Sequence, residues 1–385
     1  MRFVSLGSVA DIQLGKMLSP KSKTGNHLFP YLRNQNVQWQ HFDLTDMATM
    51  DFSQQEREKF KLLPGDLLVC EGGEPGRCAV WGGNREDCYY QKALHRVRPK
   101  KGVADSEFLA LWLRFQALTG AFEDQNSKTT IAHLPLVRLK QLPVPSLDVD
   151  EQIEISARLK SNLAEVEVAR QAAVMQLNDV SRLADSFVFD SVERSETTKH
   201  SLSDVLVEIK SGIGKTWTEY PVLGATRNGL APAKEPPGKL AQKYKPAFPG
   251  TVFYNPMRIL IGSIAFVDED DTPGITSPDY VVLKGKDGVV DSRWFYFWLR
   301  SPLGEKCISA LARGAVRERM LFNRLAEGEI YLPSFSSQKQ TSGALTELKH
   351  MRNKLKLQLS EIDLLSQKLL SRAFENRHDR EEKHQ

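Results

Sequence analysis

The segment that comes closest to a catalytic motif reads GIGKT and covers residues 212–216. A phosphate-binding loop has the pattern G-x-x-x-x-G-K-[ST], which would need glycine at position 209, where Ile209 stands. The corresponding segment earlier in the chain, residues 13–17, reads QLGKM and ends without a hydroxyl residue. We therefore interpret GIGKT as a turn with a basic residue, and a nucleotide-binding enzyme is kept only as an alternative function.

Two further segments argue against chemistry on this chain. The glycine-rich stretch of residues 72–83 lacks G-x-G-x-x-G spacing, and hairpin turns explain it better. The segment EPPG, residues 235–238, does not fit the [DNS]-P-P-[FYW] pattern that suits methylation of an exocyclic base nitrogen. We expect no catalytic residue here and place any chemistry on other chains.

The four cysteines, Cys70, Cys78, Cys88 and Cys307, form neither a CxxC pair nor a disulfide framework. His95 could join Cys88 in a zinc site, but the spacing of metal ligands is absent. The sequence therefore predicts reduced thiols and no metal.

Length and composition describe an ordinary globular protein of more than one domain. The chain has 385 residues, of which 41% are hydrophobic and 26% charged. Its apolar runs, such as residues 259–267, are shorter than the roughly 20 residues that a bilayer requires, and the start lacks the regions of a signal peptide. We expect a cytoplasmic protein. The net charge of +4 permits a nucleic-acid partner without demonstrating one.

Basic and amide side chains occur at corresponding places in the two halves of the chain. NSKTTIAHL (residues 126–134) matches ARGAVRERM (residues 312–320), and YLRNQN (residues 31–36) matches GATRNG (residues 224–229). Lys and Arg neutralise phosphates, while Arg and Asn also form paired hydrogen bonds with base edges. These residue types suit contacts with a nucleic acid, and the candidates for such contacts are Lys128, Thr129, Arg313, Arg317, Arg319, Arg33, Asn34, Arg227 and Asn228.

These correspondences belong to an internal repeat that extends over the whole chain. The matched segments include VSLGSVADIQLGK with HSLSDVLVEIKSGIGK, PGDLLV with PGTVFY, GRCAVW with GSIAFV, and DSEFLALWLR with DSRWFYFWLR. Short β-branched runs between Gly and Pro turns predict several strands in each copy, and a helix rich in aromatic residues should pack on them. Each copy is expected to fold as a compact mixed α/β domain.

A long helix is predicted after each copy. Residues 151–188 contain neither Pro nor Gly, and apolar residues recur there at alternating steps of four and three, over about four heptads. The second helix is expected from about Gly343 to Phe374. The predicted apolar seam consists of Leu159, Leu163, Val166, Leu177, Val180 and Phe187 in the first helix and Leu345, Leu348, Leu355, Leu359, Ile362 and Leu369 in the second.

Connectivity predicts that the two helices pair antiparallel, because only a few polar residues join the first helix to the second globular copy. Helices of roughly 35 to 40 residues would be about 50 to 60 Å long. The expected fold class is α+β, with two similar mixed α/β domains separated by two long antiparallel coiled-coil helices in a pseudo-two-fold, nearly circular arrangement.

A globular domain, the boundary LPVPSLDVDEQ (residues 142–152) and a long helix, followed by EIYLPSFSSQKQ (residues 329–340) and a second helix, resemble the specificity subunit of a type I restriction-modification enzyme. Gln152 and Gln340 are assigned to the recurrent Gln of that boundary, although the second boundary has Ser336, Ser337 and Lys339 where the first is acidic. The resemblance implies two target recognition domains that read an asymmetric, bipartite DNA site.

The resemblance also implies partners and cofactors. It implies two modification subunits that carry S-adenosylmethionine, and a motor-nuclease (restriction) subunit that uses ATP and Mg, with no cofactor on this chain. A non-catalytic scaffold that bridges proteins through its helices is the other alternative. The expected domains are target recognition domain 1 (1–145), a central spacer helix (146–195), target recognition domain 2 (196–333), a distal spacer helix (334–378) and a charged tail (379–385).

Overall fold

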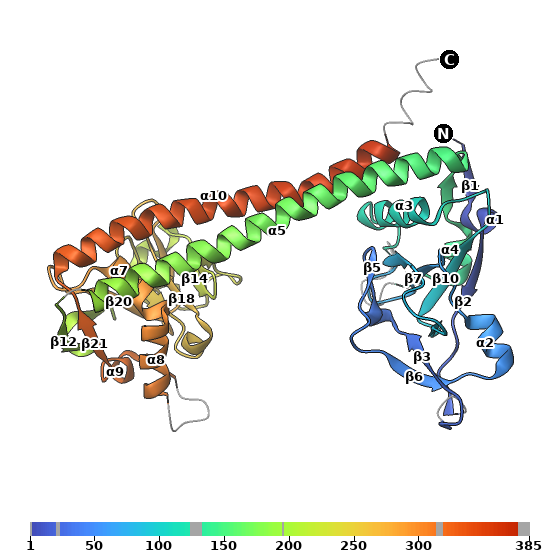
Figure 1. Ribbon diagram of the computed structural model, residues 1–385. Coiled ribbons are helices and arrows are strands. Elements are labelled where there is room, and N and C mark those ends of the chain that lie inside the picture. Colours follow the sequence, from blue (N-terminus) through green and yellow to red (C-terminus); the bar gives the residue numbers. More distant parts are fainter. Residues whose placement is uncertain (1, 21–23, 124–132, 195, 313–318, 376–385) are drawn as a thin grey trace, which may run out of the picture. The chain divides into compact units, whose positions relative to one another are not determined.

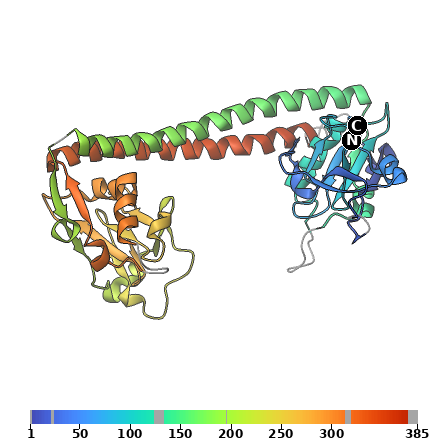
Figure 2. The same cartoon turned by 60° about the horizontal axis from the view of Figure 1, so that its bottom comes forward.

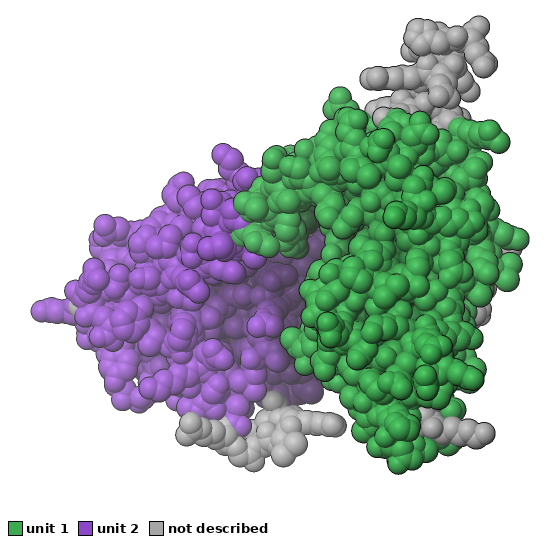
Figure 3. Space-filling view, turned by 45° about the vertical axis from the view of Figure 1, so that its right-hand side comes forward, with its two compact units in different colours: residues 1–171, 359–385 green, residues 172–358 purple. Residues whose placement is uncertain are grey.

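The computed structural model describes residues 2–20, 24–123, 133–194, 196–312 and 319–375. The chain divides into two compact units, coloured separately in Figure 3: unit 1 comprises residues 1–171 and 359–385, and unit 2 comprises residues 172–358. Each unit holds a globular part and a portion of each long helix, α5 (Val149–Glu193) and α10 (Phe335–Phe374). In the described part of the chain, every helix is too short or too polar to cross a membrane.

The globular part of unit 1 is built on a four-stranded antiparallel sheet with strand order β2-β10-β7-β8. A second sheet, β6-β3-β9, and the two-stranded pairs β1-β11 and β4-β5 complete it. Its strands are β1 (Phe3–Ser5), β2 (Ala10–Leu14), β3 (Leu28–Leu32), β4 (Val37–Gln38), β5 (His41–Phe42), β6 (Ala48–Asp51), β7 (Leu67–Cys70), β8 (Cys78–Val80), β9 (Tyr89–Tyr90), β10 (Leu94–Pro99) and β11 (Pro143–Pro145). Its helices are α1 (Leu6–Val9), η2 (Asn34–Asn36), α2 (Gln54–Phe60), α3 (Ser106–Leu118) and α4 (Leu136–Gln141).

Unit 2 repeats this plan with the sheet β13-β20-β17-β18, also antiparallel, and the pair β12-β21. Its strands are β12 (Thr198–Ser201), β13 (Leu206–Glu208), β14 (Leu223–Thr226), β15 (Gly229–Pro232), β16 (Lys245–Ala247), β17 (Val252–Tyr254), β18 (Ile264–Phe266), β19 (Gly274–Thr276), β20 (Val281–Gly285) and β21 (Glu329–Leu332). Its helices are α6 (Leu202–Val205), η3 (Gly214–Glu219), η4 (Ala241–Lys243), η5 (Ile259–Ile261), α7 (Ser292–Arg300), α8 (Pro302–Leu311) and α9 (Phe322–Leu325). The matched strands of the internal repeat therefore occupy the same positions in the two sheets.

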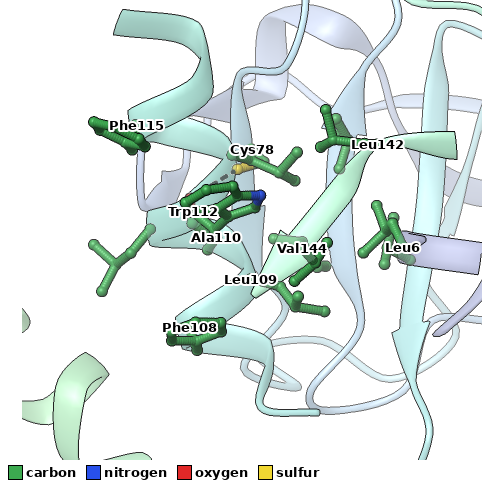
Figure 4. Packing of buried hydrophobic residues seen from close by; sticks show 14 of the residues in the cluster. Leu6, Cys78, Phe108, Leu109, Ala110, Trp112, Phe115, Leu142 and Val144 are labelled. Atoms are coloured by element: carbon green, nitrogen blue, oxygen red, sulfur yellow. Dashed lines mark hydrogen bonds between the residues drawn. The ribbon is translucent and has the colours of Figure 1, made fainter. Parts of the chain in front are cut away.

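The core of unit 1 forms where α3 covers the sheet. Figure 4 shows Trp112 of α3 beside Cys78 of β8, with Phe108 and Phe115 on the same helix, all of them buried. Phe374, near the end of α10, packs its ring against the three aromatic rings of α3 at centroid distances of 5.1–5.8 Å. The aromatic helix predicted from the sequence is thus the surface on which α10 ends.

A buried glutamine attaches each long helix to its globular part. In unit 1, Gln152 accepts a hydrogen bond from the Asp105 N–H at 3.0 Å and donates to the Val103 and Leu147 carbonyls at 3.1 and 2.9 Å. The Asp105 side chain in turn caps α3 by accepting from the Phe108 N–H at 2.8 Å.

Gln338 makes the same three bonds in unit 2, to the Asp291 N–H at 2.9 Å and to the Val289 and Pro333 carbonyls at 3.0 and 2.9 Å. Asp291 caps α7, and Ser342 donates to it as Ser156 donates to Asp105. We call each of these sets the glutamine clamp. The assignment of Gln340 to this position was wrong: Gln340 is exposed, and the boundary phrase is two residues out of register with the first one.

The second long helix also begins earlier than predicted, at Phe335 and not near Gly343. Ser334 provides the reason, because its side chain accepts from the Ser337 N–H at 3.2 Å and its carbonyl accepts from Gln338 at 3.0 Å. This cap starts the helix directly after Pro333. No atom lies within 4 Å of an added Cβ at Gly343, so packing does not require glycine at this position in the helix.

Within unit 1 the helices pair antiparallel, as predicted. Leu159 and Leu163 of α5 share a core with Leu370 and Phe374 of α10, and about two turns further along α5 Arg170 bonds Asp363 at 3.0 Å. Within unit 2, Ala184 and Val188 of α5 share a core with Leu345 of α10. In each unit the two helices lie side by side in both ribbon views (Figures 1 and 2).

The predicted seam is buried over most of its length but drifts at the ends of both helices. Phe187 is 37% exposed, and Val188 is buried in its place; likewise Leu369 is only partly buried, and Leu370 is fully buried. An unsupercoiled helix has 3.6 residues per turn, so a strict heptad pattern departs from the buried face by about 20° in each heptad, which amounts to nearly one residue after about four heptads. Among the predicted positions, the buried ones are Leu159, Leu163, Val180, Leu345, Leu355 and Ile362, and the partly buried ones are Val166, Leu177, Leu348, Leu359 and Leu369.

Candidate functional site

The candidate contact residues come from two segments of each unit. Lys128, Thr129, Arg313 and Arg317 lie outside the described residues. The others are Arg33 and Asn34, which follow β3, and Arg227, Asn228 and Arg319 in unit 2. In both units the described segments meet at one loop of the four-stranded sheet.

In unit 1 that loop joins β7 to β8, residues 71–77, and Asn34 holds it. The Asn34 side chain donates to the Gly72 carbonyl at 2.8 Å, and its own carbonyl accepts from Arg77 at 3.0 Å. Arg33 is tied elsewhere, donating to the carbonyl and the carboxylate of Asp46 at 2.8 Å each. Both side chains therefore make hydrogen bonds within unit 1, and these bonds occupy donors of two residues that the sequence analysis named as candidate contacts.

In unit 2 the matching residues stand at the tip of the β14–β15 hairpin. Arg227 and Asn228 are exposed, and Gly229 closes the turn with a φ of +100°, a value that L side chains rarely adopt. The Thr226 hydroxyl donates to the Gly229 carbonyl at 3.0 Å and accepts from the Asn228 N–H at 3.1 Å. The tip is thus fixed through its backbone, and both side chains are left at the surface.

The hairpin tip is fastened to the loop between β17 and β18, residues 255–263, which corresponds to the β7–β8 loop. The Arg300 guanidinium donates to the Arg227 carbonyl at 2.6 Å and to the Gly262 and Ile264 carbonyls at 3.1 and 3.0 Å. The Ser263 hydroxyl adds a bond to the Ala225 carbonyl at 2.7 Å. Arg300 therefore positions the two elements and is not itself available as a contact.

The segment before the second boundary reaches the same loop. The Met320 N–H donates to the Pro256 carbonyl at 3.1 Å, which brings the exposed Arg319 beside the loop. Arg319 also bonds Asp279 at 3.0 Å. In unit 1 the equivalent contact is a β-bridge between His133 and Gly72. The two sequence correspondences thus converge in space in both units.

A pocket of about 710 Å³ opens beside the hairpin tip of unit 2. Arg227, Arg300 and Arg352 line it, together with Leu260 and Ile261 of the β17–β18 loop, and Glu305 supplies an acidic group. This side of unit 2 is therefore basic and partly apolar.

Sequence reasoning missed the β17–β18 loop, where Met257, Arg258, Leu260 and Ile261 are all exposed. The loop follows a buried strand, and Leu260 and Ile261 fall within the apolar run of residues 259–267. The sequence did contain a signal for this loop. The β17–β18 segment is apolar, whereas the matched β7–β8 segment of the first copy is polar and glycine-rich, so the two copies differ here.

The GIGKT segment does not form a phosphate-binding loop. It leads into the short 3-10 helix η3, and Lys215 and Thr216 are exposed there. In the first copy, Lys16 is buried and donates to the Asp51 carbonyl at 2.5 Å and to Glu56 at 2.6 Å. The two lysines have different structural roles, and neither segment shows the strand–loop–helix geometry of a nucleotide site.

The cysteines are free thiols, and three of them are buried. Burial raises the pKa of Cys70 to about 11 and that of Cys88 to about 12, so both are protonated at neutral pH. His95 bonds the Leu134 carbonyl at 2.9 Å, and burial lowers its pKa. Over the described ranges, no three His, Cys, Asp or Glu side chains are grouped as metal ligands would be.

Comparison with known proteins finds a family match over part of the chain and a shared fold. Residues 1–176 match the family described as "Type I restriction modification DNA specificity domain". The family resemblance identified from the sequence is thereby confirmed for this part of the chain. No curated protein sequence matches the chain.

Solved structures match nearly the whole chain. One, from a study titled "Structural basis underlying complex assembly and conformational transition of the type I R-M system", has a TM-score of 0.66 at 16% identity and covers 97% of both chains. The type I restriction-modification S subunit from M. genitalium has a TM-score of 0.52 at 16% identity, covering 97% of this chain and 96% of that chain. The HsdS subunit from Thermoanaerobacter tengcongensis has a TM-score of 0.50, with the same identity and coverage. The fold class is therefore that of the type I specificity subunits, with two α/β domains and long helices.

Proposed function

We propose that the chain is the DNA specificity subunit of a type I restriction-modification complex and recognises an asymmetric, bipartite DNA site. One observation carries the proposal: the two units share strand order and the glutamine clamp but differ in the loops where the candidate contacts converge. A shared framework with different contact loops suits two readers of different half-sites. Residues 1–176, which match the specificity domain family, support the same role.

The proposed partners are two modification subunits and the restriction subunits, in the cytoplasm. S-adenosylmethionine, ATP and Mg would be bound by those chains, and this chain would be non-catalytic.

Exposed apolar residues outside the seam support docking of the partner subunits on the helices. Val168 and Met175 of α5 are one heptad apart, and Leu364 of α10 occupies the corresponding position of its own heptad. All three side chains are exposed. In a heptad they stand opposite the seam, which leaves a separate apolar face on each helix.

The test is selection from a library of random duplexes by the full chain assembled with its modification subunits. Enrichment of one split motif, with different half-sites, is the expected result. An intact assembly that enriches no motif would instead favour the scaffold alternative. Mapping of methylated bases in the host genome would identify the same target sequence independently.

Arg313 and Arg317 test the part of the interface that the described residues do not include. Arg313→Ala and Arg317→Ala should weaken DNA binding and leave the assembly intact. A guanine contact would relax discrimination at one position by about 1 to 3 kcal/mol, whereas a phosphate contact would lower affinity for all sequences alike. Unchanged binding over a salt series would remove this segment from the interface.

The absence of catalysis is tested with the isolated chain. Purified protein should show no methyl transfer, nuclease or ATPase activity of its own. Methyl transfer that is abolished by a substitution in this chain would contradict the proposal.

A further inference from the structure

The β17–β18 loop of unit 2 presents three neighbouring apolar side chains to solvent. Met257 is 58% exposed, Leu260 54% and Ile261 65%. We call these three residues the apolar platform. Exposed apolar residues are common singly, but a cluster on one short loop marks an interaction site.

The loop that carries the platform is held rigidly. Ile259, between the platform residues, is buried in the core of unit 2. Backbone bonds from Arg258 to Asn255 at 2.9 Å and from Gly262 to Ile259 at 2.9 Å close two successive turns. Arg300 then fastens the loop to the hairpin tip. The platform is therefore preformed, and its exposure does not result from a slack loop.

Cations surround the platform. Arg258 lies within the loop, Arg227 lies at the hairpin tip fastened to it, and Arg319 lies beside Met320, which bonds the loop. Asp279 pairs with Arg319, and Glu305 lines the adjoining pocket, so the surrounding side chains carry more positive than negative charge. This charge favours a polyanion over an acidic or neutral protein surface as the partner.

We infer that the apolar platform contacts thymine methyl groups in the major groove of the half-site that unit 2 reads, while Arg227 and Arg258 lie against the flanking phosphates. This inference rests on the proposed function. Side chains without donors or acceptors cannot read the hydrogen-bonding edges of bases, but they do discriminate the 5-methyl group of thymine. The half-site of unit 2 should therefore contain at least one A·T pair.

Removal of the methyl groups from the DNA tests the contact at the level of single atoms. Once the wild-type complex has selected its target, each thymine is replaced in turn by deoxyuridine, which lacks only the 5-methyl group. The full chain, assembled with its modification subunits, is compared with the double variant Leu260→Ala, Ile261→Ala. Leu240→Ala is the matched control, because Leu240 is 53% exposed and lies outside the platform.

The wild type should lose about fourfold in affinity for each methyl group that it contacts, as expected for one buried methyl-sized group. The affected thymines should lie in one half-site only. The double variant should bind the unmodified target more weakly and should no longer respond to deoxyuridine at those positions, whereas Leu240→Ala should behave as the wild type.

Three results would overturn the inference and leave the proposed function intact. They are an equal deoxyuridine effect in wild type and double variant, unchanged DNA affinity of the double variant, and a half-site without an A·T pair. If the double variant loses its modification subunits and not its DNA, the platform is a protein interface. Failure of the wild-type complex to select any motif would overturn the proposed function along with the inference.

Discussion

The β7–β8 loop of unit 1 and the β17–β18 loop of unit 2 occupy the same place in the same sheet but differ in chemistry. The first is glycine-rich and holds Glu71 and Glu74, whereas the second carries the apolar platform and Arg258. By contrast, the glutamine clamp is kept bond for bond, with partners at the same separations of 5, 47 and 49 residues along the chain. The two units thus share the glutamine clamp that holds a long helix and differ in the loops where the candidate contacts converge.

The largest effect is expected from breaking the clamp. Gln152→Ala and Gln338→Ala each leave one N–H and two carbonyls buried without a partner, which should destabilise the affected unit by about 3 kcal/mol. Because the clamps are equivalent, the two losses should be similar. Hydrogen exchange of the first turns of α3 and α7 measures them separately in the full chain.

Gln340→Ala is the matched control, because the boundary phrase alone assigns Gln340 to the clamp while the structure places it at the surface. It should change stability by less than about 0.5 kcal/mol. A loss as large as that of Gln338→Ala would show that the clamp has been wrongly assigned.

A second comparison concerns the end of the seam in unit 2. Val188→Ala removes buried methyl groups and should cost about 2 kcal/mol, whereas Phe187→Ala, at a half-exposed position, should cost less than about 1 kcal/mol. Hydrogen exchange in α7 reports both variants. The reverse order would mean that the strict heptad pattern extends to the end of α5.

The pair Gln338 and Gln340 and the pair Phe187 and Val188 show which parts of the fold can be predicted from the sequence. Strands, helix order and antiparallel pairing follow from apolar periodicity and from the internal repeat, which are strong over tens of residues. The exact position of a residue at a domain boundary is harder to predict from the sequence. Gln338 and Gln340 differ by two residues in a polar segment, and only the hydrogen bonds to Asp291 distinguish them.

The candidate site was predictable only in outline. Matching Arg33 with Arg227 located the loops that converge, but side-chain type does not reveal whether a guanidinium is already bonded. Asp46 binds Arg33, whereas the Arg227 side chain is exposed, and both depend on residues distant in the chain. The apolar platform was missed because an exposed apolar run and a buried strand have the same composition.

A cluster of charged side chains attaches α10 to the globular part of unit 2. Lys349 of α10 bonds Asp268, Asp270 and Asp271 at 2.7–3.3 Å, and Arg293 also pairs with Asp268. Burial raises the pKa of Asp268, but hydrogen bonds from Arg293 and Lys349 outweigh this effect and hold it below its ordinary 3.8. Burial lowers the pKa of Lys349, and its bonds to Asp270 and Asp268 more than offset that.

The lowered pKa values of these carboxyls determine how the stability of unit 2 depends on pH. Carboxyls with lowered pKa values stabilise unit 2 at neutral pH, and this stabilisation is lost as the pH falls below about 4. Lys349 would lose its charge only above its ordinary value of 10.5. Lys349→Leu should therefore lower the stability of unit 2 at pH 7 by about 1 kcal/mol and reduce its sensitivity to acid, as measured by hydrogen exchange between pH 7 and pH 3. The exposed Lys354→Leu is the control, and an equal change in both variants would contradict a specific attachment.

The smallest change in stability separates the two matched arginines. Arg33→Ala removes two bonds to Asp46 and should lower the stability of unit 1 by about 1 kcal/mol, with DNA binding affected only as far as the loop moves. Arg227→Ala removes an exposed side chain, and the Arg227 backbone carbonyl still accepts from Arg300, so stability should stay within about 0.5 kcal/mol. Its effect should fall on DNA: a phosphate contact would reduce the slope of log affinity against log salt by about 1 for every sequence. Thermal unfolding and a salt titration of the assembled complex measure both quantities. If Arg227→Ala destabilises unit 2 and leaves the salt slope unchanged, the hairpin tip has the same structural role as its counterpart, and the two loops differ less than their sequences suggest.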